Sequence, residues 1–503
     1  MGIRATSIAV TALVGLTASV VAIVASEPGC DAAAPADAAA LVGCVTVEDV
    51  RAHQRALQDV ADAHGGTRAS GTPGYDASVA YVAEQARAAG LTVTTQDFEF
   101  PFFEVRGESL ARDGQEYVPG TDFATMAFSG SGDASGTAVP VDLQLPPAGS
   151  STSGCEPEDF DDFPDGAVAL LQRGTCPFGV KAANAADAGA SGAVIVNAGD
   201  TPETTGVLQG TLGAPAAIPV VGAASALADE LDGAEVTLST DTVSETRSST
   251  TVFAETTGGS GEGVLMVGAH LDSVPEGPGI NDNGSGTGAV LAVAQRMAAA
   301  STERTVRFAW WGAEELGLLG AADYVATLPA AEARRIEAYL NFDMVGSPNP
   351  VRFVYDGDDS DAVGAPAGPD GSAAIEDAFE AFYAARGLAY EGTDFDGRSD
   401  YGPFIEAGIP AGGLFTGAED VKSPEQARTF GGEAGSAYDP CYHPACDTYD
   451  NVDVGVLDEN TDAVAHATFT LASGPLVATG GPAGPPGSGD GGLAPHDHGP
   501  ARS

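Results

Sequence analysis

Hydrophobic residues follow a helical period in the first part of the chain and a strand period soon afterwards. Residues 47–63 and 77–89 carry apolar side chains at the spacing of amphipathic helices, and glycines follow both stretches. Residues 91–101 then alternate between apolar and polar positions, which is typical of a strand. The pattern predicts the opening of an α/β unit.

Between about residues 106 and 245 the helical period fades, and glycine, proline and short β-like runs dominate. Runs at 167–172 and 193–196 predict strands on either side of a helix at 179–188. The stretch contains no cluster of histidine, glutamate or nucleophilic side chains. We therefore expect a second, β-rich module without chemistry of its own.

An α/β rhythm returns from residue 246, where short apolar runs alternate with alanine-rich helical stretches. The runs that predict strands are residues 251–255, 264–269, 305–311 and 338–342. Strands and helices in this alternation build a mostly parallel central sheet that helices flank on both faces. The expected fold class is α/β, with an inserted β-rich module.

The first residues indicate export. Arg4 precedes an uncharged apolar run over residues 8–25, and small residues at 24–26 offer a cleavage site. An uncleaved membrane anchor is the alternative, because the run approaches the length that spans a bilayer. We expect a secreted, extracellular protein that begins near Glu27 and does not contact the membrane after its signal is removed.

These shifts in pattern divide the chain into five parts. They are a signal peptide at 1–26, the first part of the main domain at 27–105, the inserted module at 106–245, the rest of the main domain at 246–474 and a tail at 475–503. The tail is rich in glycine and proline, which predicts disorder, so we interpret His496 and His498 as solvated residues rather than as a metal site.

The chain is strongly acidic, with Lys+Arg 21 against Asp+Glu 71 and a formal net charge of -50. A surface of this charge repels nucleic acid and anionic membranes, so we expect neither as a partner. It tolerates basic peptides, but charge alone names no substrate.

Six cysteines in an exported chain form an even set that favours disulfide pairing. Proximity in the sequence predicts the pairs Cys30 with Cys44, Cys155 with Cys176, and Cys441 with Cys446. Thiolate ligation of a metal is the alternative, but the chain lacks the CxxC spacing of such sites.

Histidine and carboxylate side chains gather where the expected strands end and in two loops. They are His270, Asp272, Asp282, Glu314, Glu315, Asp343 and, between two cysteines, His443. In open α/β sheets, functional groups collect at the carboxyl ends of the strands. Two imidazoles and several carboxylates fit a site for two divalent ions that share one carboxylate. Nitrogen and oxygen ligands favour zinc, with manganese and cobalt as alternatives.

These residues lie in motifs that resemble the zinc-dependent exopeptidases that include bacterial aminopeptidase S, aminopeptidase Y and glutamate carboxypeptidase. The motifs are GAHLDS at 268–273, NDNGSG at 281–286, WGAEELG at 311–317 and NFDM at 341–344. The inserted module resembles the protease-associated (PA) domain through LQRGTCPF at 171–178 and IPVV at 218–221. In such enzymes this domain restricts access or binds substrate, and a purely stabilising lid is the alternative.

The resemblance implies two zinc ions per chain and a role for each motif residue. His270 and Asp343 would bind one ion, Glu315 and His443 the other, and Asp282 both. Asp272 would orient His270, the usual support for a ligating imidazole.

The resemblance also implies the catalytic groups. Glu314 would be the general base that takes a proton from the attacking water and returns it to the leaving amine. Tyr442 would donate a hydrogen bond to the oxyanion, unless it is a core residue. Arg398 would help to frame the free amino end of the substrate, although an ion pair with Asp400 explains this arginine nearly as well.

The implied function is that of a secreted aminopeptidase, expected to be a monomer, that acts on peptides with a free N-terminus. Phe404, Ile405 and Phe415 would line an apolar pocket or belong to the core, and a pocket of this kind suits large apolar first residues such as Leu. The alternatives are a carboxypeptidase of the same fold, a non-catalytic receptor-like relative and a glutaminyl cyclase with one zinc.

A calcium site is the remaining expectation. Asp458 and Asp462 lie four residues apart on one face of an expected helix and offer oxygen ligands. A solvated acidic face is the alternative, both for this pair and for the acidic run at 356–361.

Overall fold

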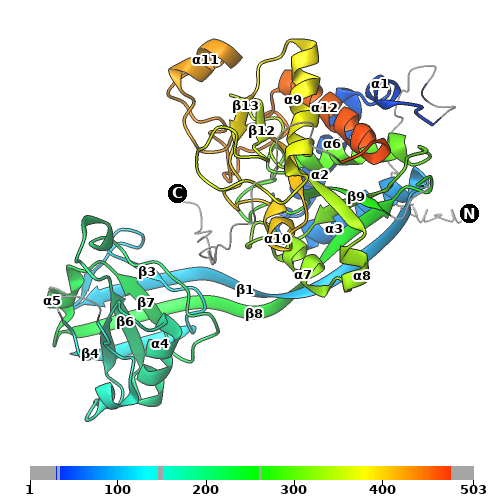
Figure 1. Ribbon diagram of the computed structural model, residues 1–503. Helices are drawn as coiled ribbons and strands as arrows, with labels where there is room; N and C mark the ends of the chain where they lie inside the picture. The colour runs from blue at the N-terminus through cyan, green and yellow to red at the C-terminus, as the bar shows by residue number, and fades with distance from the viewer. Residues whose placement is uncertain (1–29, 31–33, 145–150, 260–262, 477–503) are drawn as a thin grey trace, which may run out of the picture.

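The computed structural model describes residue 30 and residues 34–144, 151–259 and 263–476. Figure 1 shows a larger body in which helices cover a sheet, a smaller β-rich body, and a long two-stranded ribbon that joins them. The expected signal peptide and almost all of the expected tail, with His496 and His498, lie outside the described residues.

The larger body is built on a sheet with the strand order β13-β12-β14-β11-β9-β10-β8, and β1 pairs with β8. Its strands are β1 (Thr92–Arg112), β8 (Glu235–Glu255), β9 (Val264–His270), β10 (Thr305–Trp311), β11 (Ile336–Phe342), β12 (Phe353–Tyr355), β13 (Glu391–Thr393) and β14 (Ala411–Phe415). β14, β11, β9 and β10 are parallel neighbours. The expected mostly parallel sheet is confirmed, and its central strands bring their carboxyl ends to one edge.

Helices cover both faces of this sheet (Figure 1). The helices of the larger body are α1 (Ala38–Val42), α2 (Val47–Ala63), α3 (Pro73–Ala88), α6 (Gly284–Met297), α7 (Leu319–Thr327), α8 (Ala330–Ala333), α9 (Ser372–Arg386), α10 (Tyr401–Glu406), α11 (Pro424–Phe430) and α12 (Val454–Ser473). Phe308 and Trp310 of β10 enter a core closed by α2, α3, α6, α9 and α12, whereas Ala309 and Trp311 enter a core closed by α7 and α10. Burial on both faces explains the continuous apolar runs of the strands.

Capping residues set the starts of the first long helices. The helix expected over residues 47–63 is α2, with the same bounds. Thr46 and Asp49 form a capping box, in which each side chain accepts a hydrogen bond from the backbone N–H of the other residue. α3 begins four residues before the expected position, because Thr72 caps it and Pro73 suits the first helical turn.

The smaller body is the expected β-rich module, with a sheet in the order β4-β5-β6-β7-β3. Its strands are β2 (Gln115–Glu116), β3 (Phe123–Thr125), β4 (Gly132–Pro140), β5 (Val168–Gln172), β6 (Gly192–Val196) and β7 (Val220–Ala223), and its helices are α4 (Phe178–Asp187) and α5 (Leu227–Leu231). Short 3-10 helices span Pro157–Phe160 and Pro202–Thr204. The two faces of the sheet pack against separate apolar clusters.

The ribbon consists of β1 and β8, which pair antiparallel from Thr92 opposite Glu255 to Arg112 opposite Val236. The strand expected over residues 91–101 therefore continues to Arg112. The expected limits of the inserted module, at 106 and 245, both lie inside this ribbon, and the pairing register shifts between Val105 and Gly107.

All six cysteines are paired, as Cys30–Cys44, Cys155–Cys176 and Cys441–Cys446. The three predicted pairs are confirmed, and thiolate ligation of a metal is wrong because no free thiol remains. Within the described part of the chain, no helix combines the length and the apolar character needed to cross a bilayer.

Candidate active site

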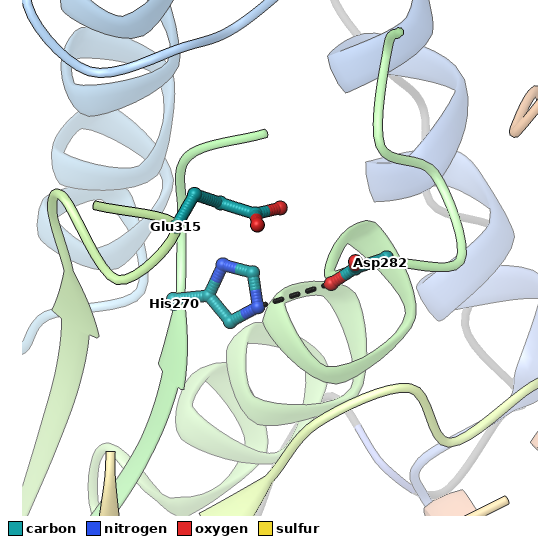
Figure 2. A group of neighbouring side chains, drawn as sticks. All are labelled: His270, Asp282 and Glu315. Atoms are coloured by element: carbon teal, nitrogen blue, oxygen red, sulfur yellow. Dashed lines mark ion pairs between the residues drawn. The ribbon is translucent and has the colours of Figure 1, made fainter. Parts of the chain in front are cut away.

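The carboxyl ends of three neighbouring strands deliver most of the candidate residues to one point. β9 ends at His270, β10 ends three residues before Glu314, and Asp343 follows the last residue of β11. Asp282 comes from the loop that precedes α6, and Figure 2 shows it facing His270, with Glu315 close by. The parallel register of these strands is what brings together residues that are far apart in sequence.

Asp282 lies between the two histidines. His270 Nε2 is 3.2 Å from Asp282 Oδ1 and 3.2 Å from Asp343 Oδ1. His443 Nε2 is 3.3 Å from Asp282 Oδ2 and 3.0 Å from Glu315 Oε2. The two oxygens of one carboxylate therefore face two different imidazoles, each of which has a further carboxylate of its own.

The pKa values in this group reflect burial and close opposite charges. Burial lowers the pKa of His443, but hydrogen bonds to Asp282 and Glu315 outweigh burial and raise that pKa to about 11. Burial raises the pKa of Asp282, yet its contacts with His270 and His443 outweigh burial and hold that pKa below its ordinary value. Asp282 is therefore ionised at neutral pH, as a metal ligand must be.

The donor atoms fit divalent metal ions. Ligand atoms of His270, Asp282 and Glu315 lie within 4.8 Å of one another, and so do those of His270, Glu314 and Asp343. Glu315 Oε1 is buried without a hydrogen-bond partner among the described residues. Imidazole nitrogen and carboxylate oxygen are ligands that zinc accepts, and a bound cation would satisfy this atom.

Glu314 and Glu315 are adjacent in sequence but have different surroundings. Burial raises the pKa of Glu314 well above its ordinary value, against the opposing charge of His270. Burial also raises the pKa of Glu315, to about 7, with Asp282 adding to the shift and His443 opposing it. Glu315 contacts an imidazole directly, whereas Glu314 is a buried carboxyl group with an increased affinity for a proton.

The contact between Asp272 and His270 involves the main chain. His270 Nδ1 lies 3.1 Å from the Asp272 carbonyl oxygen, whereas the Asp272 carboxylate is 3.6 Å away. That carboxylate accepts a hydrogen bond from the Glu314 backbone N–H at 3.3 Å. Asp272 thus links the segment that carries His270 to the segment that carries Glu314.

Sequence reasoning missed three residues that hold the site together. Ser399 donates a hydrogen bond to Asp343 Oδ2 at 2.7 Å. Asp447 accepts hydrogen bonds from the backbone N–H groups of Asn281 and Asp282, at 2.8 and 2.9 Å. The Asp439 carboxylate accepts one from the Asn281 side chain at 2.7 Å. The available signal was that Asp439 and Asp447 flank the CYHPAC segment that carries His443.

A cleft of about 740 Å³, part of it open to solvent, adjoins the cluster. Its lining includes Asp282, Glu314, Glu315, Asp343, Met344, Tyr355, Asp394, Asp396, Arg398, Phe415, Glu419, Asp420 and Tyr442. Of the three expected pocket residues only Phe415 lines the cleft, because Phe404 and Ile405 pack in the core under α10. The cleft thus combines apolar side chains with many carboxylates.

Arg398 lies in this cleft, and the alternative of an ion pair with Asp400 is wrong. The guanidinium is 3.0 Å from Glu419 and donates a hydrogen bond to the Tyr442 hydroxyl at 3.2 Å. Asp400 is fully buried, and its carboxylate oxygens have no hydrogen-bond partner among the described residues. Arg398 therefore lines the cleft, whereas Asp400, two positions later, lies in the interior.

In the expected calcium site, Asp462 accepts a hydrogen bond from Arg386 at 2.5 Å. In the acidic run, Asp356 accepts hydrogen bonds from the backbone N–H groups of Asp358, Ser360 and Asp361. Asp356 is buried, so a solvated acidic face does not describe it, and ligand atoms of Asp356, Asp359 and Asp361 lie within 4.8 Å of one another.

An α/β sheet edge that gathers two imidazoles and several carboxylates beside an open cleft defines a metal-dependent hydrolase. Residues 251–468 match the model of peptidase family M28, and residues 134–231 match that of the PA domain. The chain therefore belongs to peptidase family M28 and carries a PA domain as its inserted module.

Individual relatives agree with this assignment. The chain is 46% identical over 440 residues to an aminopeptidase of Pseudomonas aeruginosa, and the match covers 85% of this chain and 81% of that one. It is 39% identical over 438 residues to leucine aminopeptidase 2 of Arthroderma otae, with 85% of each chain covered. The solved aminopeptidase from Aneurinibacillus sp. strain AM-1 has a TM-score of 0.65 and 25% identity, and the match covers 88% of this chain and 97% of that one. The resemblance stated from the motifs is confirmed, and the chain is an aminopeptidase of this family.

Proposed function

We propose that the protein is a secreted two-zinc aminopeptidase that removes large apolar first residues, such as Leu, from peptides. The observation that carries this proposal is the position of Asp282, whose two oxygens face His270 and His443 at 3.2 and 3.3 Å. A carboxylate in that position can bind two cations at once.

Five side chains would hold the two ions. His270 and Asp343 form one set, His443 and Glu315 form the other, and Asp282 belongs to both. All five are present, which argues against a receptor-like relative without catalysis. Bound zinc would supply Lewis-acid activation of a water molecule and polarisation of the scissile carbonyl group.

Glu314 is suited to move the proton. Burial raises the pKa of its carboxyl group, so the carboxylate is a stronger base than an exposed glutamate. Glu314 lines the same cleft as the proposed ligands. The carboxylate that contacts His443, at 3.0 Å, is that of Glu315 and not that of Glu314. We assign Glu314 the removal of a proton from the attacking water and its return to the leaving amine.

Tyr442 is suited to stabilise the oxyanion. Its hydroxyl oxygen accepts the hydrogen bond of Arg398, so the hydroxyl proton is left to donate towards the cleft. A fixed donor aimed at the charge that develops on the carbonyl oxygen lowers the barrier of acyl transfer. Arg398 acts in this scheme by holding Tyr442 and by shaping the end of the cleft that takes the free amino group.

The charge of the cleft favours an aminopeptidase over a carboxypeptidase. Asp394, Asp396, Glu419 and Asp420 line it beyond the proposed ligands. Among the described lining residues Arg398 is the single cation, and it is paired with Glu419 at 3.0 Å. Carboxylates attract a substrate ammonium group, whereas a terminal carboxylate needs free basic groups to bind.

Apolar lining supports the proposed residue preference. Met344, Tyr355 and Phe415 line the cleft beside Asp343 and Glu314. A leucine side chain gains free energy when it leaves water for such a surface. The 39% identical relative from Arthroderma otae is a leucine aminopeptidase, which agrees with this preference.

Secretion of a monomer that acts on free peptides completes the proposal. Three disulfides favour an oxidising compartment, in agreement with the export signal expected over residues 1–26. We propose 106–245 as the limits of the inserted domain, and we expect that domain to limit access or to bind substrate.

The proposal is tested by zinc analysis together with hydrolysis of leucine p-nitroanilide and its N-acetylated form. We expect about two zinc ions per chain, cleavage of the free substrate and no cleavage of the blocked one. Equal cleavage of the blocked substrate would refute the aminopeptidase mechanism, and about one zinc per chain would favour a cyclase-type site.

A further inference from the structure

The loop that joins the first two candidate ligands is wrapped around a buried arginine. Residues 271–281 follow His270 directly and end before Asp282. Arg68, from the connection between α2 and α3, is 0% exposed. Nothing in the chemistry described above uses this side chain, although a fully buried arginine is rare unless it is paired.

Among the described residues, every hydrogen bond of the Arg68 guanidinium goes to a backbone carbonyl of that loop. Nε donates to Pro278 at 2.8 Å and Nη2 donates to Gly279 at 2.6 Å, while Nη1 donates to Leu271. The bonds therefore join the first residue after His270 to the residues just before Asp282. One planar fork fixes the distance between the two ends of the loop.

Neighbouring side chains strengthen the same connection. The Arg68 backbone N–H donates to Ser273 Oγ at 2.9 Å, and Ser273 Oγ donates to the Gly277 carbonyl oxygen at 2.9 Å. Gly279 has a φ of +62°, and a Cβ there would lie 2.3 Å from the Asp282 carbonyl oxygen. The loop is thus packed tightly between Arg68 and Asp282.

The positive charge of Arg68 lies close to several buried carboxylates. The carboxylates of Asp272, Asp447 and Asp282 lie within electrostatic reach of the guanidinium. A permanent buried cation offsets the repulsion among these acids, and it cannot bind in the metal site because it offers donors only.

We propose that Arg68 is a positioning residue of the metal site, which sets the separation of His270 and Asp282 by bonding the three loop carbonyls. The inference rests on the proposed zinc-binding function of those ligands. A lysine at this position keeps the charge but presents a single nitrogen, so it cannot reproduce the planar fork.

The test is zinc affinity of metal-free protein, measured by competition with a chelator, in Arg68→Lys and in a stability control. The control is Leu57→Val, because Leu57 is a fully buried residue of α2 whose shortening leaves the hydrogen bonds of the loop to Arg68 in place. We expect Arg68→Lys to weaken zinc binding by about 10- to 100-fold, the usual effect of losing support behind a ligand. We expect Leu57→Val to lower the unfolding temperature while zinc affinity stays as in the wild type.

Wild-type zinc affinity in Arg68→Lys would overturn the inference, and so would an equal loss of affinity in Leu57→Val. If Arg68→Lys does not fold, Ser273→Ala removes one link of the same loop, and its zinc affinity must fall for the inference to stand. A wild-type protein that binds no zinc would instead overturn the proposed function, so the two failures are distinguishable.

Discussion

The Tyr442 hydroxyl accepts a hydrogen bond from the Arg398 guanidinium over 3.2 Å, and the same nitrogen of Arg398 lies 3.0 Å from Glu419. The arginine is thus fixed by a carboxylate on one side and fixes a phenol on the other. In the proposed mechanism this contact leaves the tyrosine proton to donate towards the cleft, so the two residues would act together.

Tyr442→Phe is therefore expected to lower kcat by about 10²- to 10³-fold, the effect of losing one oxyanion donor, with a small change in KM. Arg398→Met should give a smaller loss, and the double variant should lose little more than Tyr442→Phe alone. Steady-state kinetics on leucine p-nitroanilide measure this coupling. Fully additive losses would show that Arg398 does not act through Tyr442.

Glu314→Gln is expected to lower kcat by about 10²- to 10⁴-fold, because an amide cannot accept the proton of the attacking water. Zinc content should stay at the wild-type level. Glu337→Gln is the matched control, since Glu337 is exposed on β11 and pairs with Arg304 at 2.5 Å, away from the cleft. Wild-type activity in Glu314→Gln would assign the base to another group.

Removal of the Cys441–Cys446 disulfide should impair the site. The bridge closes the short loop that carries Tyr442 and His443, so the double serine variant loses preorganisation of both side chains. We expect zinc affinity to fall by about tenfold or more. The Cys155–Cys176 pair lies in the PA domain, and its double serine variant should keep wild-type zinc affinity. Equal losses in both variants would contradict a local role.

Stability is expected to fall between pH 6.5 and 4 because of His53. Burial lowers its pKa from 6.5 to about 4, and the neutral ring contacts Tyr81 at 2.7 Å and Gln295 at 3.2 Å. The folded-state pKa is lower than the unfolded one, so this contribution is complete above pH 6.5 and is lost as the pH falls towards 4. Linkage gives a loss of about 2 kcal/mol at pH 5.

Urea denaturation at pH 7.5 and pH 5 measures this effect as the difference between wild type and His53→Gln. The variant has no ring to protonate, so its stability should depend less steeply on pH. An identical pH dependence in both proteins would rule out His53 as the source.

The acidic cleft predicts discrimination against acidic first residues. Asp394 and Asp420 add negative charge beside the apolar lining, so substrates that begin with Glu should have a lower kcat/KM than those that begin with Leu or Lys. The penalty should shrink in 1 M salt, where the Debye length is about 3 Å. A preference for Glu would contradict the proposed charge of the subsite.

Local signals predicted the framework of the fold. α2 has the expected bounds because Thr46 and Asp49 cap it and its apolar stripe enters one core. The outer half of β1 was not predicted, because residues such as Glu104 and Arg106 are exposed on a ribbon that imposes no strict alternation. A strand is recognised from the core that it faces, and the ribbon faces none around Glu104 and Arg106.

The site could be predicted only as far as its motifs extend. His270, Asp282 and Asp343 follow strand or loop signals, so their meeting was expected from the parallel topology. The ion-pair partner of Arg398 was not predicted, because Asp400, two positions away in sequence, is buried and the true partner, Glu419, is 21 positions away. Asp447 was missed because it binds backbone N–H groups 165 and 166 positions away, which no local pattern encodes.

Anomalous diffraction at the zinc edge tests whether Asp282 joins two zinc ions. We expect two peaks in a crystal of the zinc-loaded protein, one beside His270 and Asp343 and one beside His443 and Glu315, with the Asp282 carboxylate between them. A single peak, or a second peak that Asp282 does not contact, would contradict it.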